Sequence, residues 1–250
     1  MICGILAGIT WAAETVIIGI ALAMTPFVTS VEAMFLAPFV STFIHDAASA
    51  IYMMLYNGFR RNLGAVLSVC RTRSFKFLVL SSAIGGPVGM TGYVLAVRYM
   101  GASVGAVSSA AYPAIGSVLA YLFLKENIRR SQWLFLTVTL IGVFGLSYSS
   151  DLNITNFWIG LVGILMCSFG WGIEGVILSK CLGDADIKCE YALQIRQTVS
   201  ALIYGVAILP LIGAGRFTLD LFADGGISAV TVIATAAFFA TVSYLCYYHA

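Results

Sequence analysis

Charged residues are scarce in this chain of 250 residues: Asp, Glu, Lys and Arg make up only 10% of it, and apolar residues make up 60%. Typical soluble proteins contain roughly a quarter charged residues, and a soluble chain of this size has no core large enough for so many apolar side chains. A lipid bilayer accepts them, because there the surroundings of the protein are apolar too. The formal net charge is only +2 and no basic stripe is present, which excludes a nucleic-acid partner.

Motifs for metal binding, disulfides and catalysis are also missing. The six cysteines contain no C-x-x-C spacing, and no pair of histidines lies near them. We therefore expect no metal site, no cofactor and no disulfide framework. His45 with Asp46 is the only pair of a histidine and an acid, and no metalloprotease or nucleophile motif accompanies it, so we expect no catalytic residues.

Long apolar runs without alternation predict membrane-spanning helices rather than the strands of a barrel. A spanning helix needs about 20 mostly apolar residues. The first run has no basic leader and contains Glu14, so we interpret it as a retained span rather than a signal peptide. We expect an all-α polytopic membrane protein with eight transmembrane helices, at Ile2–Met24, Val31–Tyr56, Phe75–Val97, Gly101–Leu124, Gln132–Ser149, Trp158–Cys181, Tyr191–Gly213 and Gly226–Ala250.

Basic residues concentrate in alternate links between these spans. The links at residues 57–76, 125–130 and 180–188 carry most of the lysines and arginines, and by parity they lie on the same side as the N-terminus. Basic links are retained on the cytoplasmic side of a membrane, so we expect a cytoplasmic N-terminus. Gly85-Gly86-Pro87 and Pro113 lie within predicted spans, where we expect the helices to bend or break beside a cavity.

One heptamer pattern occurs twice. Residues 11–17 and 171–177 both read Trp-x-x-Glu-x-Val-Ile. The second copy begins five predicted helices after the first, and this odd number inverts it relative to the membrane. Inverted repeats are typical of secondary carriers, whose substrate site lies at the midplane where the halves meet. We therefore expect two inverted five-helix repeats, with Trp11 and Trp171 approaching one another at the interface.

The two expected repeats differ in length. The first occupies residues 1–150, whereas the second, residues 151–250, is truncated after its third helix. A second repeat that matched the first would need two more helices. We therefore expect a ten-helix carrier of which eight helices are present here, and we expect residues 1–250 not to transport alone.

Several stretches resemble a known family. They are Gly86–Met90, Ala96–Gly101, Tyr112–Ile115, Phe123–Lys125, Trp171–Glu174, Ile195–Gln197 and Ser243–Tyr248, and His45-Asp46 also fits. With these stretches the chain resembles the drug/metabolite transporter (EamA-like) superfamily, and it looks especially like the bacterial choline permease of that superfamily. The resemblance implies ten helices in two inverted repeats, a bacterial cytoplasmic (inner) membrane location, and a choline-like organic cation as substrate.

The resemblance also implies an aromatic substrate site, since aromatic side chains surround the ammonium group in that permease. The matching substrate-binding positions here are Trp11, Tyr112, Trp171, Tyr244 and Tyr248, with Glu174 matching an acid. Physical chemistry agrees: a trimethylammonium head has no N–H to donate, and aromatic faces hold it instead, at roughly 0.5–2 kcal/mol each when desolvated. Ordinary packing within the membrane is the alternative interpretation of each ring.

Ionisable residues inside the predicted spans form a second group of candidates, because charges in a bilayer are costly and usually functional. Glu14 lies near the midplane by helix rise, and we expect it to contact the substrate, although the family pattern implies no role for it. A protonated and inert Glu14 stays open. For Glu174, a structural pair with Arg196 is the alternative to a substrate contact.

Candidates for coupling or gating are His45, Asp46, Arg196 and Gln197. Protons are one coupling ion to consider, and uniport driven by the membrane potential is the alternative. We expect a secondary transporter of choline or a related quaternary ammonium compound that works by alternating access in contact with membrane lipid. Efflux of drugs or metabolites, a non-transporting membrane bundle and an intramembrane enzyme are the alternatives, and a homodimer stays open.

Overall fold

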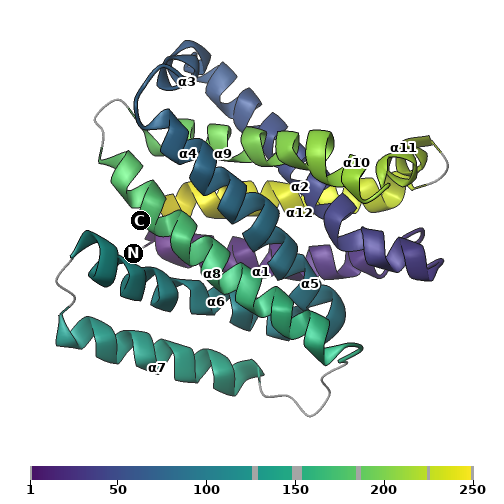
Figure 1. Cartoon of the computed structure of the whole chain (residues 1–250), viewed down its shortest axis with the longest axis horizontal. Helices are drawn as coiled ribbons and strands as arrows, with labels where there is room; N and C mark the ends of the chain where they lie inside the picture. Colours follow the sequence, from purple (N-terminus) through teal and green to yellow (C-terminus); the bar gives the residue numbers. More distant parts are fainter. Residues whose placement is uncertain (1, 126–128, 148–153, 184–186, 224–225, 249–250) are drawn as a thin grey trace.

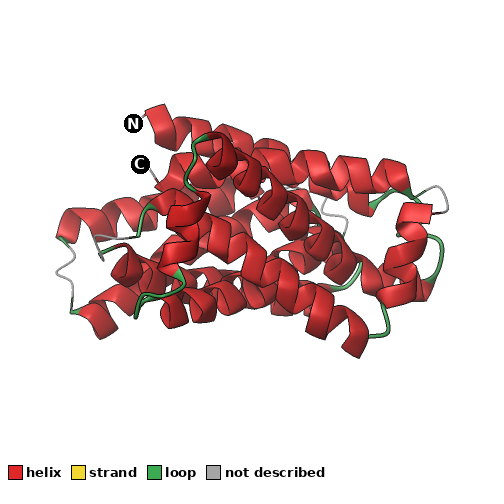
Figure 2. Cartoon of the chain, turned by 90° about the horizontal axis from the view of Figure 1, so that it is seen from above, coloured by secondary structure: helices red, strands yellow, loops and turns green. Residues whose placement is uncertain are grey.

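The computed structural model of the chain describes residues 2–125, 129–147, 154–183, 187–223 and 226–248. Within these ranges every regular element is a helix (Figure 1). Most of the helices run roughly along one direction, as a bundle, when the molecule is seen from above (Figure 2).

The longest single helices are α1 (Ile2–Leu22), α2 (Val31–Phe59), α6 (Ala102–Leu119), α7 (Arg130–Ser147), α8 (Phe157–Leu182) and α12 (Ile227–Tyr248). Two further rods consist of consecutive pieces. One contains α4 (Phe75–Ala83), the π-helical segment η1 (Ile84–Met90) and α5 (Thr91–Met100), and the other contains α9 (Cys189–Ile203), the π-helical η3 (Tyr204–Ile208) and α10 (Leu209–Leu211). The π-helical η2 (Ala120–Leu124) continues α6, and α3 (Leu63–Val69) and α11 (Gly215–Ala223) are short helices outside the rods.

Seven of these rods, among the described residues, are long and apolar enough to cross a membrane. They correspond to every predicted span except the one at residues 132–149. The helix α7 covers most of that segment but does not meet the same criteria, so its crossing stays a prediction, and residues 148 and 149 lie outside the described ranges. The protein is thus a multi-pass helical membrane protein.

Side chains are distributed as a bilayer requires, with apolar groups outside and ionisable groups inside. Along one face of α1, Ile5, Ile9 and Ile20 are 58%, 62% and 54% exposed, whereas Glu14 on the same helix is fully buried. Lipid tails solvate the outer face, and the buried carboxylate needs partners within the bundle. The interior of the bundle is therefore the polar region in which a site is to be sought.

The contacts between the rods define this interior. The helix α1 packs along α12, α2 lies against both α9 and α12, and α8 crosses the α4–η1–α5 rod and α6. The N-terminus, α3 and the C-terminal end of α12 lie at one end of the bundle, and α11 lies at the other (Figure 1). The helix α7 packs mainly on α6 and forms the edge of the bundle.

The predicted helix irregularities are confirmed at one position and not at the other. Gly85, Gly86 and Pro87 lie in η1, where the backbone departs from the α-helical pattern. The helix α6 instead continues through Pro113 without a break, and its π-helical segment η2 begins only at residue 120.

Where α5 meets α8, a side chain is not tolerated: a Cβ on Gly92 would lie 2.5 Å from the Cys167 backbone nitrogen and 2.6 Å from the Gly163 carbonyl oxygen.

Candidate functional site

A cavity of about 820 Å³ lies between α1, α6, α8 and α12. Its wall contains four of the five predicted aromatic residues and the predicted acid Glu174: the rings are those of Trp11, Tyr112, Trp171 and Tyr244. Small residues of α1 and α6 form other parts of the wall, and their short side chains leave the space between the rings open. The fifth predicted aromatic, Tyr248, lies in the last turn of α12, and its side chain falls outside the described part of the structure.

The aromatic rings form one continuous cluster around Trp11 and Trp171. The ring centroids of Trp11 and Trp171 are 5.4 Å apart in an edge-to-face arrangement, which confirms the predicted approach of the two indoles. Trp11 also contacts Tyr244 at 5.6 Å, and Trp171 contacts Tyr112 at 5.7 Å. Tyr93 of α5 lies behind both indoles, at 5.4 Å from Trp11 and 5.5 Å from Trp171. Tyr247 of α12 also lines the cavity and lies 6.4 Å from Tyr112. The five cavity-lining rings therefore present several aromatic faces and edges to a single space.

Hydrogen bonds from both indole nitrogens fix the orientation of the two tryptophans. Trp11 Nε1 donates to Ser109 Oγ at 3.2 Å, and Trp171 Nε1 donates to the Gly85 carbonyl at 2.9 Å. The carbonyl that accepts the second bond belongs to the π-helical segment η1. Gly89 brings the same segment close: a Cβ there would lie 2.5 Å from the Trp171 ring. The glycine-rich motif thus shapes the wall of the cavity.

Glu174 is one helical turn from Trp171 and forms an ion pair with Arg196 of α9. Arg196 Nε donates to Glu174 Oε1 at 2.9 Å, and Nη1 donates to Gln197 Oε1 at 3.0 Å. The guanidinium also lies over the Tyr244 ring, 5.0 Å from its centroid. The ion pair that the sequence left open as an alternative is therefore present, but it forms at the wall of the cavity rather than away from it.

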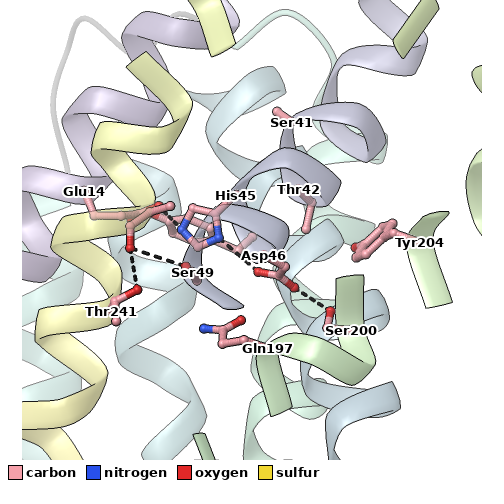
Figure 3. A network of polar contacts seen from close by, with 12 residues as sticks. Glu14, Ser41, Thr42, His45, Asp46, Ser49, Gln197, Ser200, Tyr204 and Thr241 are labelled. Atoms are coloured by element: carbon pink, nitrogen blue, oxygen red, sulfur yellow. Dashed lines mark hydrogen bonds and ion pairs between the residues drawn. The ribbon is translucent and has the colours of Figure 1, made fainter. Parts of the chain in front are cut away.

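A second polar network lies deeper in the bundle and joins α1, α2 and α9 (Figure 3). Glu14 Oε1 lies 3.8 Å from His45 Nε2, and His45 Nδ1 lies 3.0 Å from Asp46 Oδ1. Asp46 Oδ2 in turn accepts a hydrogen bond from Ser200. All four side chains are fully buried. The chain of contacts therefore runs through the interior from α1 to α9.

Tyr93 connects this network to the aromatic cluster. Its hydroxyl donates to Glu14 Oε2 at 2.8 Å and contacts Thr15 Oγ1 at 2.7 Å, while its ring packs against both indoles. Glu14 itself does not line the cavity, so the structure places it behind the aromatic wall. Sequence reasoning missed Tyr93, Ser109 and Ser200, because their roles come from contacts between helices and the sequence carries no signal for them.

A second cavity of about 640 Å³ lies between α4, α8 and η2, toward the end of the bundle that carries α3. Its wall is apolar apart from Ser74, Lys180 and Cys181, and it contains none of the predicted site residues. The concentration of aromatic and ionisable groups singles out the larger cavity as the candidate site.

These features define a membrane protein with an aromatic cavity and buried charges inside its helical bundle. Residues 1–148 match the EamA-like transporter family. Because this match covers more than half of the chain, the protein belongs to that family, which is a family of transporters rather than of enzymes. Over 172 residues, 68% of this chain, it is 28% identical to Protein LicB of Haemophilus influenzae. The matched region covers 56% of that relative, so the chain spans just over half of its length.

Proposed function

We propose that this protein is a secondary carrier that binds choline or a related quaternary ammonium compound in the aromatic cavity and moves it by alternating access. The contact network around Trp11 and Trp171 is the observation that carries this proposal. A quaternary ammonium head offers no hydrogen-bond donor, and several aromatic faces around one space attract it through their quadrupoles. Glu174 adds a carboxylate at the same wall. The cavity volume of about 820 Å³ lies in the range usual for small-molecule sites.

The packing of the helices supports two inverted repeats. Exchanging α1 with α8, α2 with α9, and the α4–η1–α5 rod with α12 converts the α1–α12 contact into the contact between α8 and that rod. The same exchange converts the α2–α12 contact into the α9–α4 contact and returns the α2–α9 contact to itself, and all of these contacts are present. The helices α1 and α8 also run in opposite directions (Figure 1). Trp11 and Trp171 exchange with each other, and their direct contact supports a two-fold axis that passes between them.

The orientation that we propose places the end with the N-terminus and α3 in the cytoplasm, in a bacterial inner membrane. Arg60, Arg61, Arg71 and Arg73 all flank α3 at this end, and basic segments are retained on the cytoplasmic side. That residues 151–250 belong to the second repeat, and that the protein forms a homodimer, are proposals of the same kind.

Substrate charge gives the direct test of the proposed function. Choline should bind the purified protein at least about tenfold more tightly than its neutral isostere with a tert-butyl head, because each desolvated cation–π contact contributes roughly 0.5–2 kcal/mol and the isostere forms none. Isothermal titration calorimetry with both ligands measures the ratio. Equal affinities would overturn the organic-cation proposal and leave efflux of drugs or metabolites as the alternative.

We propose in addition that Glu14 and His45 carry the coupling proton. Glu14 Oε1 and His45 Nε2 face each other at 3.8 Å, and both atoms are buried without a hydrogen-bond partner in the described structure. A proton on either atom would convert this contact into a hydrogen bond and draw α1 toward α2. Tyr93 transmits such a movement to the indoles, because it contacts Glu14 and both rings.

Replacing Glu14 by glutamine should therefore make choline uptake insensitive to a pH gradient while the response to membrane voltage is retained. The amide keeps the shape of the side chain but cannot exchange a proton at this site. Uptake into proteoliposomes that contain the full-length gene product measures the effect under imposed pH or voltage gradients, with Glu32→Gln as control because Glu32 is exposed at the start of α2. Unchanged stimulation by the pH gradient in the Glu14 variant would remove Glu14 from the coupling site.

A further inference from the structure

The guanidinium of Arg196 occupies the two features that an organic cation would use. Glu174 and Tyr244 both line the cavity, and both are already engaged by Arg196, through the 2.9 Å hydrogen bond to the carboxylate and the 5.0 Å cation–π contact with the ring. The chain thus supplies its own cation to the site. A carboxylate and an aromatic face in contact with one cation cannot offer the same surfaces to a second.

We propose that Arg196 is an internal competitor of the substrate: the ammonium head displaces its guanidinium from Glu174 and Tyr244, and the guanidinium returns when the substrate leaves. This inference rests on the proposed function, because it needs an organic cation as substrate. Beyond that function, the inference assigns a role to Arg196: its competition lowers the apparent affinity for the substrate, and its charge neutralises Glu174 when the cavity is empty.

The guanidinium is held loosely enough to move. Nε and Nη1 each donate one hydrogen bond, whereas Nη2 is buried without a partner in the described structure. A buried arginine normally uses most of its five N–H donors, so an unused nitrogen lowers the cost of leaving Glu174. The bond from Nη1 to Gln197 comes from the adjacent residue on α9 and constrains only the tip of the side chain.

A second carboxylate lies within reach of the displaced guanidinium. Ser200 is one turn further along α9 than Arg196, and its hydroxyl donates to Asp46 of α2. Side chains four residues apart on a helix are neighbours, so Arg196 lies next to Ser200. Asp46, which Ser200 contacts, is therefore close enough for the long arginine side chain to approach it. Movement from Glu174 to Asp46 would exchange an ion pair between α8 and α9 for one between α2 and α9. Occupancy of the cavity would in this way change the contact between the two proposed repeats.

In this arrangement Arg196 neutralises Glu174 when no substrate is bound, and a carrier needs such neutralisation in order to return empty. With substrate bound, the ammonium balances Glu174, and without it Arg196 does so, so the carboxylate is not left unpaired inside the bilayer in either state. The empty carrier can then change its orientation without carrying an uncompensated charge across the membrane. Removal of Arg196 should consequently strengthen binding but impair the return of the empty carrier.

The variant Arg196→Gln tests this separation of binding from turnover. We expect its Kd for choline to fall about tenfold, a shift within the range usual for coupled binding events. In proteoliposomes that contain the full-length gene product with this substitution, exchange of labelled for unlabelled choline should be retained, whereas net uptake should be lost. Arg98→Gln is the matched control and should keep its Kd, because Arg98 donates to the Leu22 carbonyl, outside the cavity. An unchanged or higher Kd in monodisperse Arg196→Gln protein would overturn the proposal.

A structure of the unmodified protein with choline bound provides the second test, which does not depend on the folding of any variant. The Arg196 Nε to Glu174 Oε1 distance should have lengthened beyond hydrogen-bonding range from its present 2.9 Å. Choline seated in the cavity with this hydrogen bond intact would overturn the internal competitor alone and leave the proposed function standing. Absence of choline binding in the unmodified protein would instead remove the proposed function.

Discussion

Replacing Trp171 by leucine is expected to raise the Kd for choline about tenfold, whereas phenylalanine in its place is expected to raise it only about twofold. Phenylalanine keeps a ring face toward the cavity and leucine does not, and both lose the hydrogen bond to Gly85. The difference between the two variants therefore isolates the ring. Calorimetry or ligand-dependent tryptophan fluorescence of the purified variants measures it.

The control is Trp158→Leu, the same substitution on the same helix at a position that is 72% exposed. Its Kd should match that of the unmodified protein. Equal losses in the phenylalanine and leucine variants of Trp171 would assign the effect to the hydrogen bond with Gly85, and no loss in the leucine variant would remove Trp171 from the site.

Replacing Gly92 by alanine is expected to lower the apparent melting temperature of the protein in detergent by about 2–12 °C. Overpacking typically costs about 1–3 kcal/mol, and each kcal/mol shifts the melting temperature of a chain of this size by roughly 2–4 °C. The added methyl group would meet backbone atoms of Cys167 and Gly163, which cannot rotate away as a side chain does. Relief therefore requires α5 and α8 to separate along their contact.

The matched control for this prediction is Gly175→Ala on α8, where an added Cβ would have no atom within 4 Å. Alanine is the better helix former, so this variant should melt at the same temperature or slightly higher. Fluorescence-detected size exclusion after heating distinguishes the two variants. A Gly92→Ala protein as stable as the Gly175→Ala protein would show that the contact between α5 and α8 relaxes without cost.

The predicted spans largely coincide with the observed rods, because both depend on long apolar runs. The length and composition of such a run can be read directly from the sequence. The short helices α3 and α11 were not expected, because segments of 7 and 9 residues are too short to give a span signal. Pro113 was expected to bend or break its helix, but α6 continues through it without a break; proline removes only one backbone donor, and the remaining turns keep theirs.

The site was predictable where a residue type is rare in its setting. Trp11, Trp171 and Glu174 stand out in apolar helices, and the repeated heptamer relates two of them, so their meeting could be expected. Tyr93 could not be found in this way, because a tyrosine in a span is common and its bond to Glu14 depends on how α5 lies against α1. The position of Glu14 behind the aromatic wall depends on the same packing and could not be obtained from helix rise alone.

The hydrogen bond between Trp171 and the Gly85 carbonyl has a consequence for mutational scanning. An alanine scan measures what a side chain contributes by removing it, but at Gly85 it adds a methyl group and leaves the accepting oxygen in place. Such a scan would score η1 as a sterically sensitive segment and overlook the acceptor that orients one wall of the cavity. A backbone ester between residues 85 and 86 weakens the carbonyl as an acceptor without adding an atom to that wall. Of these two changes, the ester is the one that reports on the carbonyl.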